Sequence, residues 1–213
     1  MDAKTCLLTR RSVRKYRSDP IPDADLLEIL EAGCYAPSAI NLQHWYFAAL
    51  RSPEDMAALK EIMVRVVTAF NPTLRERFAK HPETIAQTQN FLATLGGAPV
   101  CVLAFFRKND YPDRDGAMQS VAAAIENILL AAWDKGIGSC WISAPLKVGM
   151  GEELRQRFAP DKGEFVAAIT LGYPDETPAA RSAGAGSSTC GDYRPSISRV
   201  SCPPNRTPAR KMV

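Results

Sequence analysis

The spacing of apolar residues along the chain predicts helices that cover several short buried strands. Where apolar residues recur at helical intervals, the stretch acquires one apolar face; where they run continuously over a few positions, a strand covered on both faces is expected. The predicted helices include residues 26–32, 56–67 and 117–135. The predicted strands are residues 45–50, 100–106, 139–142 and 164–171.

Capping and helix-breaking residues set the ends of these helices. Asp23 is a favourable N-cap, and Ser52 followed by Pro53 marks another helix start. The sequence Phe70-Asn71-Pro72 is expected to end that second helix, because proline lacks the N–H that a helix needs. A further helical region is predicted over residues 73–95, and Gly136 is expected to close the helix at 117–135.

A cationic stretch near the N-terminus, here called the basic segment (residues 10–16), has the chemistry of a phosphate site. It reads Arg-Arg-Ser-Val-Arg-Lys-Tyr, and guanidinium groups with a small hydroxyl are the usual donors to a phosphate dianion. In an extended chain, alternation places on one face Arg10, Ser12 and Arg14, and on the other Arg11, Val13 and Lys15. The alternative is a solvated basic run with no ligand.

A second stretch, here called the amide loop (residues 36–45), carries side chains suited to a polar ring edge. It reads Ala-Pro-Ser-Ala-Ile-Asn-Leu-Gln-His-Trp. The amides of Asn41 and Gln43 can both donate and accept hydrogen bonds, as such an edge requires. The alternative is an ordinary polar turn, since proline, serine and asparagine are common turn residues.

The glycines at 136 and 138 do not form a dinucleotide fingerprint. Their order is helix, glycines, strand, whereas the dinucleotide motif needs strand, glycines, helix.

The basic segment and the amide loop together resemble the nitroreductase family of FMN-dependent oxidoreductases. Two later stretches, residues 136–142 (Gly-Ile-Gly-Ser-Cys-Trp-Ile) and 171–174 (Leu-Gly-Tyr-Pro), follow in the family's order and spacing, and the resemblance covers about residues 5–181. It implies an α+β fold, an α/β sandwich whose central mixed, mainly antiparallel sheet is flanked by helices. It also implies a homodimer that holds the flavin at the subunit interface.

The same resemblance assigns roles to individual residues. Arg10, Ser12 and Arg181 would bind the phosphate, and Arg14 would lie at the ribityl chain or the N1/O2 edge. The loop residues would approach the ring, and the backbone at Ser143 and Ala144 would donate near N5. The complete candidate set for FMN is Arg10, Arg11, Ser12, Arg14, Pro37, Ser38, Asn41, Asn71, Ser143, Ala144 and Arg181.

Two of these positions carry open alternatives. Asn71 either contacts the flavin ring, as an amide in this region often does in the family, or marks a helix stop before Pro72. His44 stands where the family usually has proline, and we interpret it as a structural histidine or a loop change rather than a proton donor, although a histidine there would titrate near neutral pH.

The resemblance implies an enzyme that uses NAD(P)H to reduce nitroaromatics, quinones or similar electron-poor acceptors by ping-pong hydride transfer. No catalytic side chain is required, and NADH is not distinguished from NADPH. Alternatives are another reaction on the same flavin fold (reductive dehalogenation, dehydrogenation or flavin destruction) or a flavin-binding protein without turnover. Specificity is expected to lie in residues 68–95 and in the loop 107–116.

Charge and composition limit the partners and the cellular compartment expected for this protein. The net charge is +3, but residues 182–213 carry five cations and one acid, a net of +4, which leaves the rest near −1. A domain with this charge lacks the excess of positive charge that is typical of nucleic-acid binding. The sequence has no run of about 18 apolar residues, so no membrane span is predicted. Six scattered cysteines indicate a reducing compartment, which predicts a cytoplasmic protein.

The chain is expected to consist of a flavin-binding domain, residues 1–181, and an atypical tail, residues 182–213. The tail has no hydrophobic periodicity and little to bury, so disorder is predicted. A shifted reading frame would produce a similar composition, and the role of the tail stays open.

Overall fold

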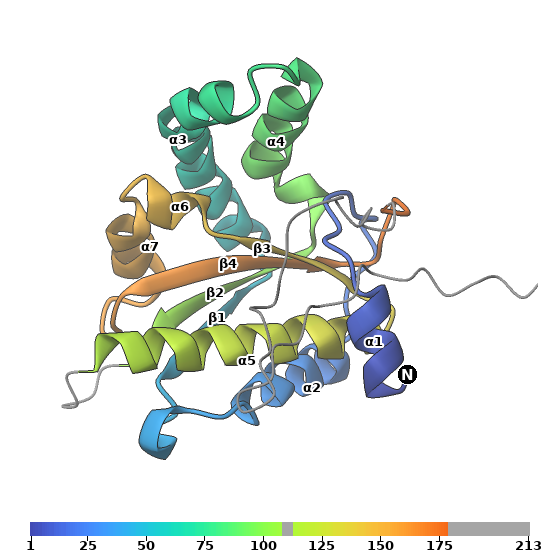
Figure 1. Ribbon diagram of the computed structural model, residues 1–213, viewed down its shortest axis with the longest axis vertical. Coiled ribbons are helices and arrows are strands. Elements are labelled where there is room, and N and C mark those ends of the chain that lie inside the picture. The colour runs from blue at the N-terminus through green and yellow to red at the C-terminus, as the bar shows by residue number, and fades with distance from the viewer. Residues whose placement is uncertain (108–112, 179–213) are drawn as a thin grey trace, which may run out of the picture. The chain divides into compact units, whose positions relative to one another are not determined.

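A four-stranded sheet separates two helical layers in the computed structural model, which describes residues 1–107 and 113–178 (Figure 1). The strands lie in the order β1-β2-β4-β3, and all three pairs are antiparallel. A single parallel bridge, between Ser12 and Ser139, adds the mixed character that was expected. The strands are β1 (Trp45–Leu50), β2 (Val100–Phe106), β3 (Gly138–Ile142) and β4 (Phe165–Gly172). The predicted α+β sandwich is therefore confirmed.

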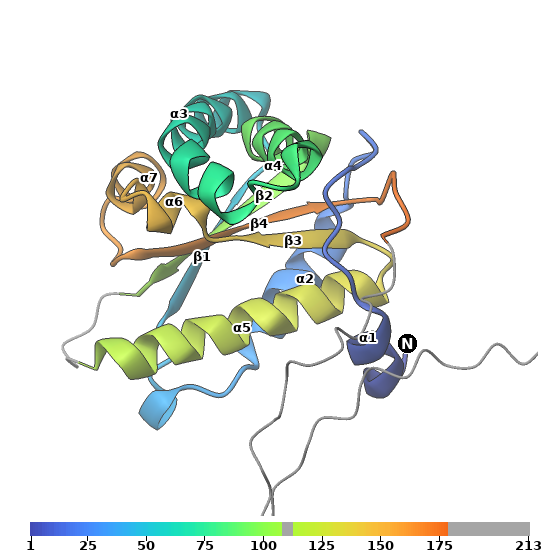
Figure 2. The same ribbon diagram turned by 45° about the horizontal axis from the view of Figure 1, so that its top comes forward.

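Helices cover both faces of this sheet (Figures 1 and 2). One face carries α3 (Pro53–Arg77), α4 (Pro82–Thr94), α6 (Ala144–Lys147) and α7 (Gly151–Phe158). The other face carries α2 (Asp23–Cys34) and α5 (Arg114–Asp134). The short helix α1 (Ala3–Thr9) packs on α5, where Trp133 Nε1 donates to Thr9 Oγ1 at 3.0 Å. Two short 3₁₀ turns complete the set, η1 (Ala39–Asn41) and η2 (Leu95–Gly97).

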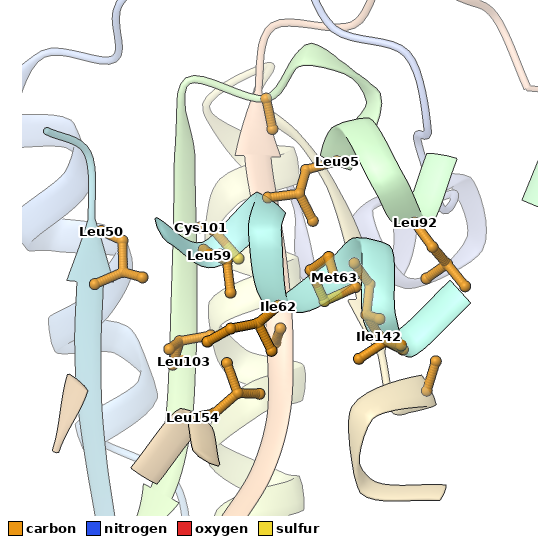
Figure 3. Close-up of a cluster of buried hydrophobic side chains, with 14 of the residues drawn as sticks. Leu50, Leu59, Ile62, Met63, Leu92, Leu95, Cys101, Leu103, Ile142 and Leu154 are labelled. Carbon is orange, nitrogen blue, oxygen red and sulfur yellow. The ribbon is translucent and has the colours of Figure 1, made fainter. Parts of the chain in front are cut away.

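Alternating residues of the central strands divide the core into two hydrophobic clusters. On β2, Cys101, Leu103 and Phe105 belong to the cluster under α3, and the residues between them belong to the cluster under α5. Every residue of β2 is buried, as its continuous apolar run predicts. Figure 3 shows the first cluster, in which Ile62 and Met63 of α3 lie above the sheet.

The predicted helix stop at residues 70–72 is wrong, because α3 continues through Pro72 to Arg77. Pro72 and Thr68 are both exposed. Because Pro72 has no N–H, the carbonyl of Thr68 lacks its i+4 hydrogen-bond donor, but this carbonyl lies on the solvent-facing side of the helix. One turn farther on, Leu74 is 2% exposed and continues the apolar face of α3. Packing of that face outweighs the local cost of the proline.

The other helix ends agree with the prediction from the sequence or differ from it by a few residues. Ser52 caps α3 as predicted, accepting from Asp55 N–H at 3.0 Å. The N-cap of α2 is Pro22 rather than Asp23, whose carboxylate instead pairs with Arg51. Helix α5 starts at Arg114, so the expected loop 107–116 ends earlier, and its residues 108–112 lie outside the described chain. The tail 182–213 also lies outside it.

Among the residues that the structure describes, no helix is long and apolar enough to cross a membrane.

Replacing Pro72 by alanine is expected to raise the free energy of unfolding by roughly 1–3 kcal/mol, because alanine restores the missing N–H and removes the ring. Urea denaturation followed by circular dichroism measures this change. The matched control is Pro53→Ala at the first helical position, where no intrahelical bond is lost and little change is expected. Lower stability of the Pro72 variant would contradict this account of α3.

Candidate functional site

The basic segment lies along the free edge of β3. Val13 N–H donates to Ser139 O at 2.9 Å, and Tyr16 N–H donates to Gly96 O at 3.0 Å. Val13 and Tyr16 are buried in the core, whereas Arg14 and Lys15 are exposed. Apolar anchors thus fix an extended strip whose charged side chains are presented outward.

Glycines leave the space that this strip occupies. Gly138 and Gly172 are cross-strand partners, and a Cβ at Gly138 would lie 2.8 Å from Val13 Cβ. A Cβ at Gly172 would lie 2.9 Å from the Tyr16 ring. The glycine-rich stretch at 136–138 therefore serves packing and helix termination, since Gly136 ends α5 with a φ of 73°.

Arg10, Ser12 and Arg14 occupy alternate positions of the extended strip that bridges to β3 at Ser12 and Ser139. Burial raises the pKa of the nearby Cys140 thiol, and Arg14, Ser12 and Arg10 oppose the rise, while Glu176 adds to it. The two guanidinium groups have different neighbours, since Arg10 Nε lies 3.5 Å from a Glu126 carboxylate oxygen on α5 and the Arg14 guanidinium lies 6.0 Å from the centre of the Phe91 ring on α4. Two guanidinium groups and a hydroxyl are donors suited to a phosphate dianion, and the phosphate role of these three residues stays a prediction.

The other two cations of the basic segment, Arg11 and Lys15, contact groups within the protein. Arg11 Nη1 donates to the carbonyls of Leu8 at 2.9 Å and Arg10 at 2.7 Å, which closes the end of α1. Lys15 Nζ lies 2.6 Å from a carboxylate oxygen of Asp175. Arg11 is thus engaged by backbone carbonyls at the end of α1, and its predicted role toward a ligand stays a prediction.

The chain that leaves β4 holds the basic segment from its outer side. Asp175 N–H donates to Lys15 O and Arg17 N–H donates to Tyr173 O, each at 2.9 Å, and the Glu176 carboxylate accepts from Arg14 N–H. Sequence analysis missed Glu176, for which no motif gives a signal. Arg181, predicted to return to the phosphate, lies outside the described residues.

The amide loop has a strained backbone. Ile40, Asn41 and Gln43 have φ values of 43°, 59° and 49°, in the left-handed region that residues other than glycine seldom adopt. Ser38 spans the turn, because its carbonyl accepts from Asn41 N–H and its hydroxyl from Gln43 N–H, both at 3.0 Å. Pro37, Asn41 and Gln43 are exposed, so the loop presents polar groups outward.

His44 differs from its neighbours in being only 1% exposed. Neither of its ring nitrogens has a hydrogen-bond partner among the described residues. Its carbonyl accepts from Arg107 N–H at the start of β1. This burial favours the interpretation of His44 as a structural residue.

Three further candidates lie on the side of the sheet that α3 and α6 cover. Asn71 Oδ1 accepts from Gln89 Nε2 at 2.9 Å and from Arg75 Nε at 3.3 Å, which ties α3 to α4. Ser143 and Ala144 join β3 to α6, at the opposite end of β3 from the basic segment. Of the two alternatives for Asn71, the helix stop is excluded and the flavin contact stays a prediction.

The basic segment and the amide loop lie at opposite corners of the sheet. The loop precedes β1 at one edge, and the segment lies on β3 at the other. They also lie at opposite ends of the strands. Leu50 at the end of β1 falls in line with Cys140 across the register, next to the Ser12–Ser139 bridge, whereas the loop adjoins Trp45 at the start of β1. Figures 1 and 2 show this separation (blue strip against light-blue turn). One chain therefore does not bring the two motifs together.

Comparison with known proteins decides the family. The model of the nitroreductase family matches residues 7–173. The chain belongs to the nitroreductase family. The predicted family resemblance is thus confirmed over nearly the whole described chain.

Individual members of the nitroreductase family resemble this chain over most of its length. YfhC of Bacillus subtilis (strain 168), named as an NAD(P)H nitroreductase, is 34% identical over 172 residues, or 80% of this chain and 83% of the relative. A 5,6-dimethylbenzimidazole synthase of Rhodospirillum rubrum is 30% identical, covering 78% and 79%. A nitroreductase with bound FMN from Bacteroides fragilis NCTC 9343 superposes with a TM-score of 0.66 at 28% identity, covering 89% and 98%.

The variant Gly138→Ala is expected to lower the free energy of unfolding by roughly 1–3 kcal/mol, because the added methyl overlaps Val13. Urea denaturation measures the loss. The neighbouring Ser139→Ala serves as a control, since the Ser139 hydroxyl is buried without a hydrogen-bond partner in the described chain and its removal is expected to be nearly neutral. Equal losses at both positions would mean that the glycine gap is unimportant.

Proposed function

We propose that this protein is an FMN-dependent oxidoreductase that uses NAD(P)H to reduce nitroaromatics, quinones or similar electron-poor acceptors. The observation that carries the proposal is the extended basic segment beside β3, which the buried residues Val13 and Tyr16 anchor and which presents cations at its surface. Membership in the nitroreductase family and the FMN-bound structural neighbour support the choice of flavin.

The donor set fits the phosphate of FMN. Arg10 is half-buried and its Nε lies 3.5 Å from a Glu126 carboxylate oxygen, a contact loose enough to be exchanged for a phosphate. The Arg14 guanidinium lies 6.0 Å from the centre of the Phe91 ring, within reach of a cation–π contact, and the residue is exposed. Ser12 adds a hydroxyl between the two cations.

Bound FMN supplies the hydride-transfer chemistry, and the protein supplies binding, orientation and electrostatics. Arg10 and Ser12 would hold the phosphate, and Arg14 would place a positive charge near the ribityl chain or ring. The N–H groups at Ser143 and Ala144 would face the ring from the start of α6. No acid–base pair is needed, and the donor and the acceptor would occupy the same space in turn, which predicts ping-pong kinetics.

A homodimer would complete the site. Because the amide loop and the basic segment lie at opposite corners of one sheet, three strand spacings or about 14 Å apart across the strands alone, both motifs meet at one flavin only if a second copy supplies the loop. Large apolar side chains are exposed on α2, at its C-terminal end and in the loop: Leu27 at 65%, Tyr35 at 79% and Ile40 at 68%. Their burial would stabilise such a dimer.

A cytoplasmic location is part of the proposal. The cysteines of the described residues, Cys6, Cys34, Cys101 and Cys140, are all free thiols. Reduced thiols are typical of a reducing compartment.

One alternative has a specific observation in its favour. The similarity to a 5,6-dimethylbenzimidazole synthase keeps flavin destruction as a second candidate. The two candidates differ in the fate of the flavin, which is regenerated in a reductase and consumed in the alternative. Mass spectrometry of the flavin after aerobic incubation with NADPH separates them.

The variants Arg10→Ala and Arg14→Ala are each expected to weaken FMN binding about 10- to 100-fold, because each removes a charge-assisted hydrogen bond. Quenching of flavin fluorescence measures the dissociation constant. Lys15→Ala is the matched control, since this neighbouring cation is paired with Asp175. For Arg10, riboflavin binding is expected to change much less than FMN binding, and an equal loss for both would remove it from the phosphate site.

An anaerobic visible spectrum of the purified protein tests the reaction. We expect a flavin spectrum that bleaches on addition of NADPH or NADH and recovers on addition of a nitroaromatic or quinone acceptor. A flavin spectrum that neither nucleotide bleaches would contradict the donor. A protein that takes up no FMN would contradict the proposed function as a whole.

A further inference from the structure

The amide loop needs an anchor outside itself. Its three left-handed residues include Ile40, whose branched side chain makes such a backbone conformation especially unfavourable. Ile40 is also 68% exposed, so its own packing does not hold the turn. Strain of this kind persists only where the surrounding structure fixes it, and it is frequent at ligand sites.

Ser120 of α5 provides that anchor. Its hydroxyl accepts from Ala39 N–H at 3.0 Å and donates to Gly116 O at 2.6 Å, and the side chain is 4% exposed. A hydroxyl is both donor and acceptor, so it can connect a helix carbonyl to a loop amide in one step. Serine in a helix often donates to the carbonyl four residues earlier, but this hydrogen bond alone makes no contact with a distant loop.

The first turn of α5 is shaped to receive the loop. A Cβ at Gly116 would lie 3.1 Å from Ala39 Cβ and 2.1 Å from Asp113 Oδ2, so the absence of a side chain there lets the loop approach the helix. Asp113 caps this turn by accepting from Gly116 N–H at 2.8 Å. Gly116 therefore leaves the space for the contact between Ala39 and α5, and Ser120 supplies its hydrogen bond.

We propose that Ser120 is a positioning residue of the flavin site, acting through Ala39 to hold the left-handed turn that directs the exposed amides of Asn41 and Gln43. This inference rests on the proposed function, because it takes the loop to be a flavin contact. Without the hydroxyl, Ala39 N–H loses its partner and the strained turn is free to relax. The loop amides would then be displaced from the geometry that binding requires.

The test compares Ser120→Ala with Ser120→Thr, which keeps the hydroxyl, and with Ser52→Ala. Ser52 also accepts a backbone N–H at 3.0 Å, but at the start of α3. Hydrogen exchange of the flavin-free protein follows residues 38–43, and fluorescence titration and the visible band of bound FMN follow the site. We expect Ser120→Ala to accelerate exchange in the loop, weaken FMN binding about tenfold and shift the visible band. Ser120→Thr should remain within about threefold of the wild type, and Ser52→Ala should lower stability without either flavin effect.

The outcomes separate this inference from the proposed function. Unchanged loop exchange in Ser120→Ala would overturn the anchor, whatever the flavin does. Faster exchange with unchanged FMN affinity and spectrum would overturn the positioning role while leaving FMN binding intact. A flavin effect in Ser52→Ala as large as that in Ser120→Ala would reduce the result to lost stability and overturn the inference. Failure of the wild-type protein itself to bind FMN would overturn the proposed function, and this inference with it.

Discussion

Burial of β2 and β4 on both faces is the constraint on which the rest of this structure depends. Every residue of these two strands is buried, so each needs a helical layer above and below it. The strands with less apolar length, β1 and β3, are left at the edges. An edge strand offers unpaired backbone groups, and on β3 these groups receive the basic segment through Val13 and Ser139.

Close packing at the edge of β3 fixes the position of the basic segment. Gly138 and Gly172 remove side chains where Val13 and Tyr16 must enter, and the entry of these two residues fixes the path of the cations between them. The apolar and charged residues of one short segment thus differ in place, since Val13 and Tyr16 are buried as anchors and Arg14 and Lys15 are exposed. The amide loop follows a similar principle at the other corner, where Gly116 and Ser120 of α5 make room for it and hold it.

Local sequence signals were sufficient for much of the fold and for part of the candidate site. The apolar runs at 45–50 and 100–106 match β1 and β2 residue for residue. The run in β2 reflects full burial, whereas the edge strand β1 is buried only at its two ends and half-buried between them. Alternation within the basic segment predicts one face for Arg10, Ser12 and Arg14, and the extended strip beside β3 has the backbone form that this alternation requires. The family motifs were sufficient for membership in the nitroreductase family, which the match over residues 7–173 confirms.

The sequence by itself determined the four strands, most of the helices and the helix ends at Ser52 and Gly136, since these depend on neighbours within a few positions along the chain. Only the tertiary structure decided that α3 passes through Pro72, because the gain comes from burying Leu74 against the distant core. It alone placed the two motifs at opposite corners, and it alone joined Ser120 to Ala39, residues 81 positions apart in the chain. A lone serine in a helix carries no periodic signal, so its partner becomes visible only when the helix and the loop are packed together.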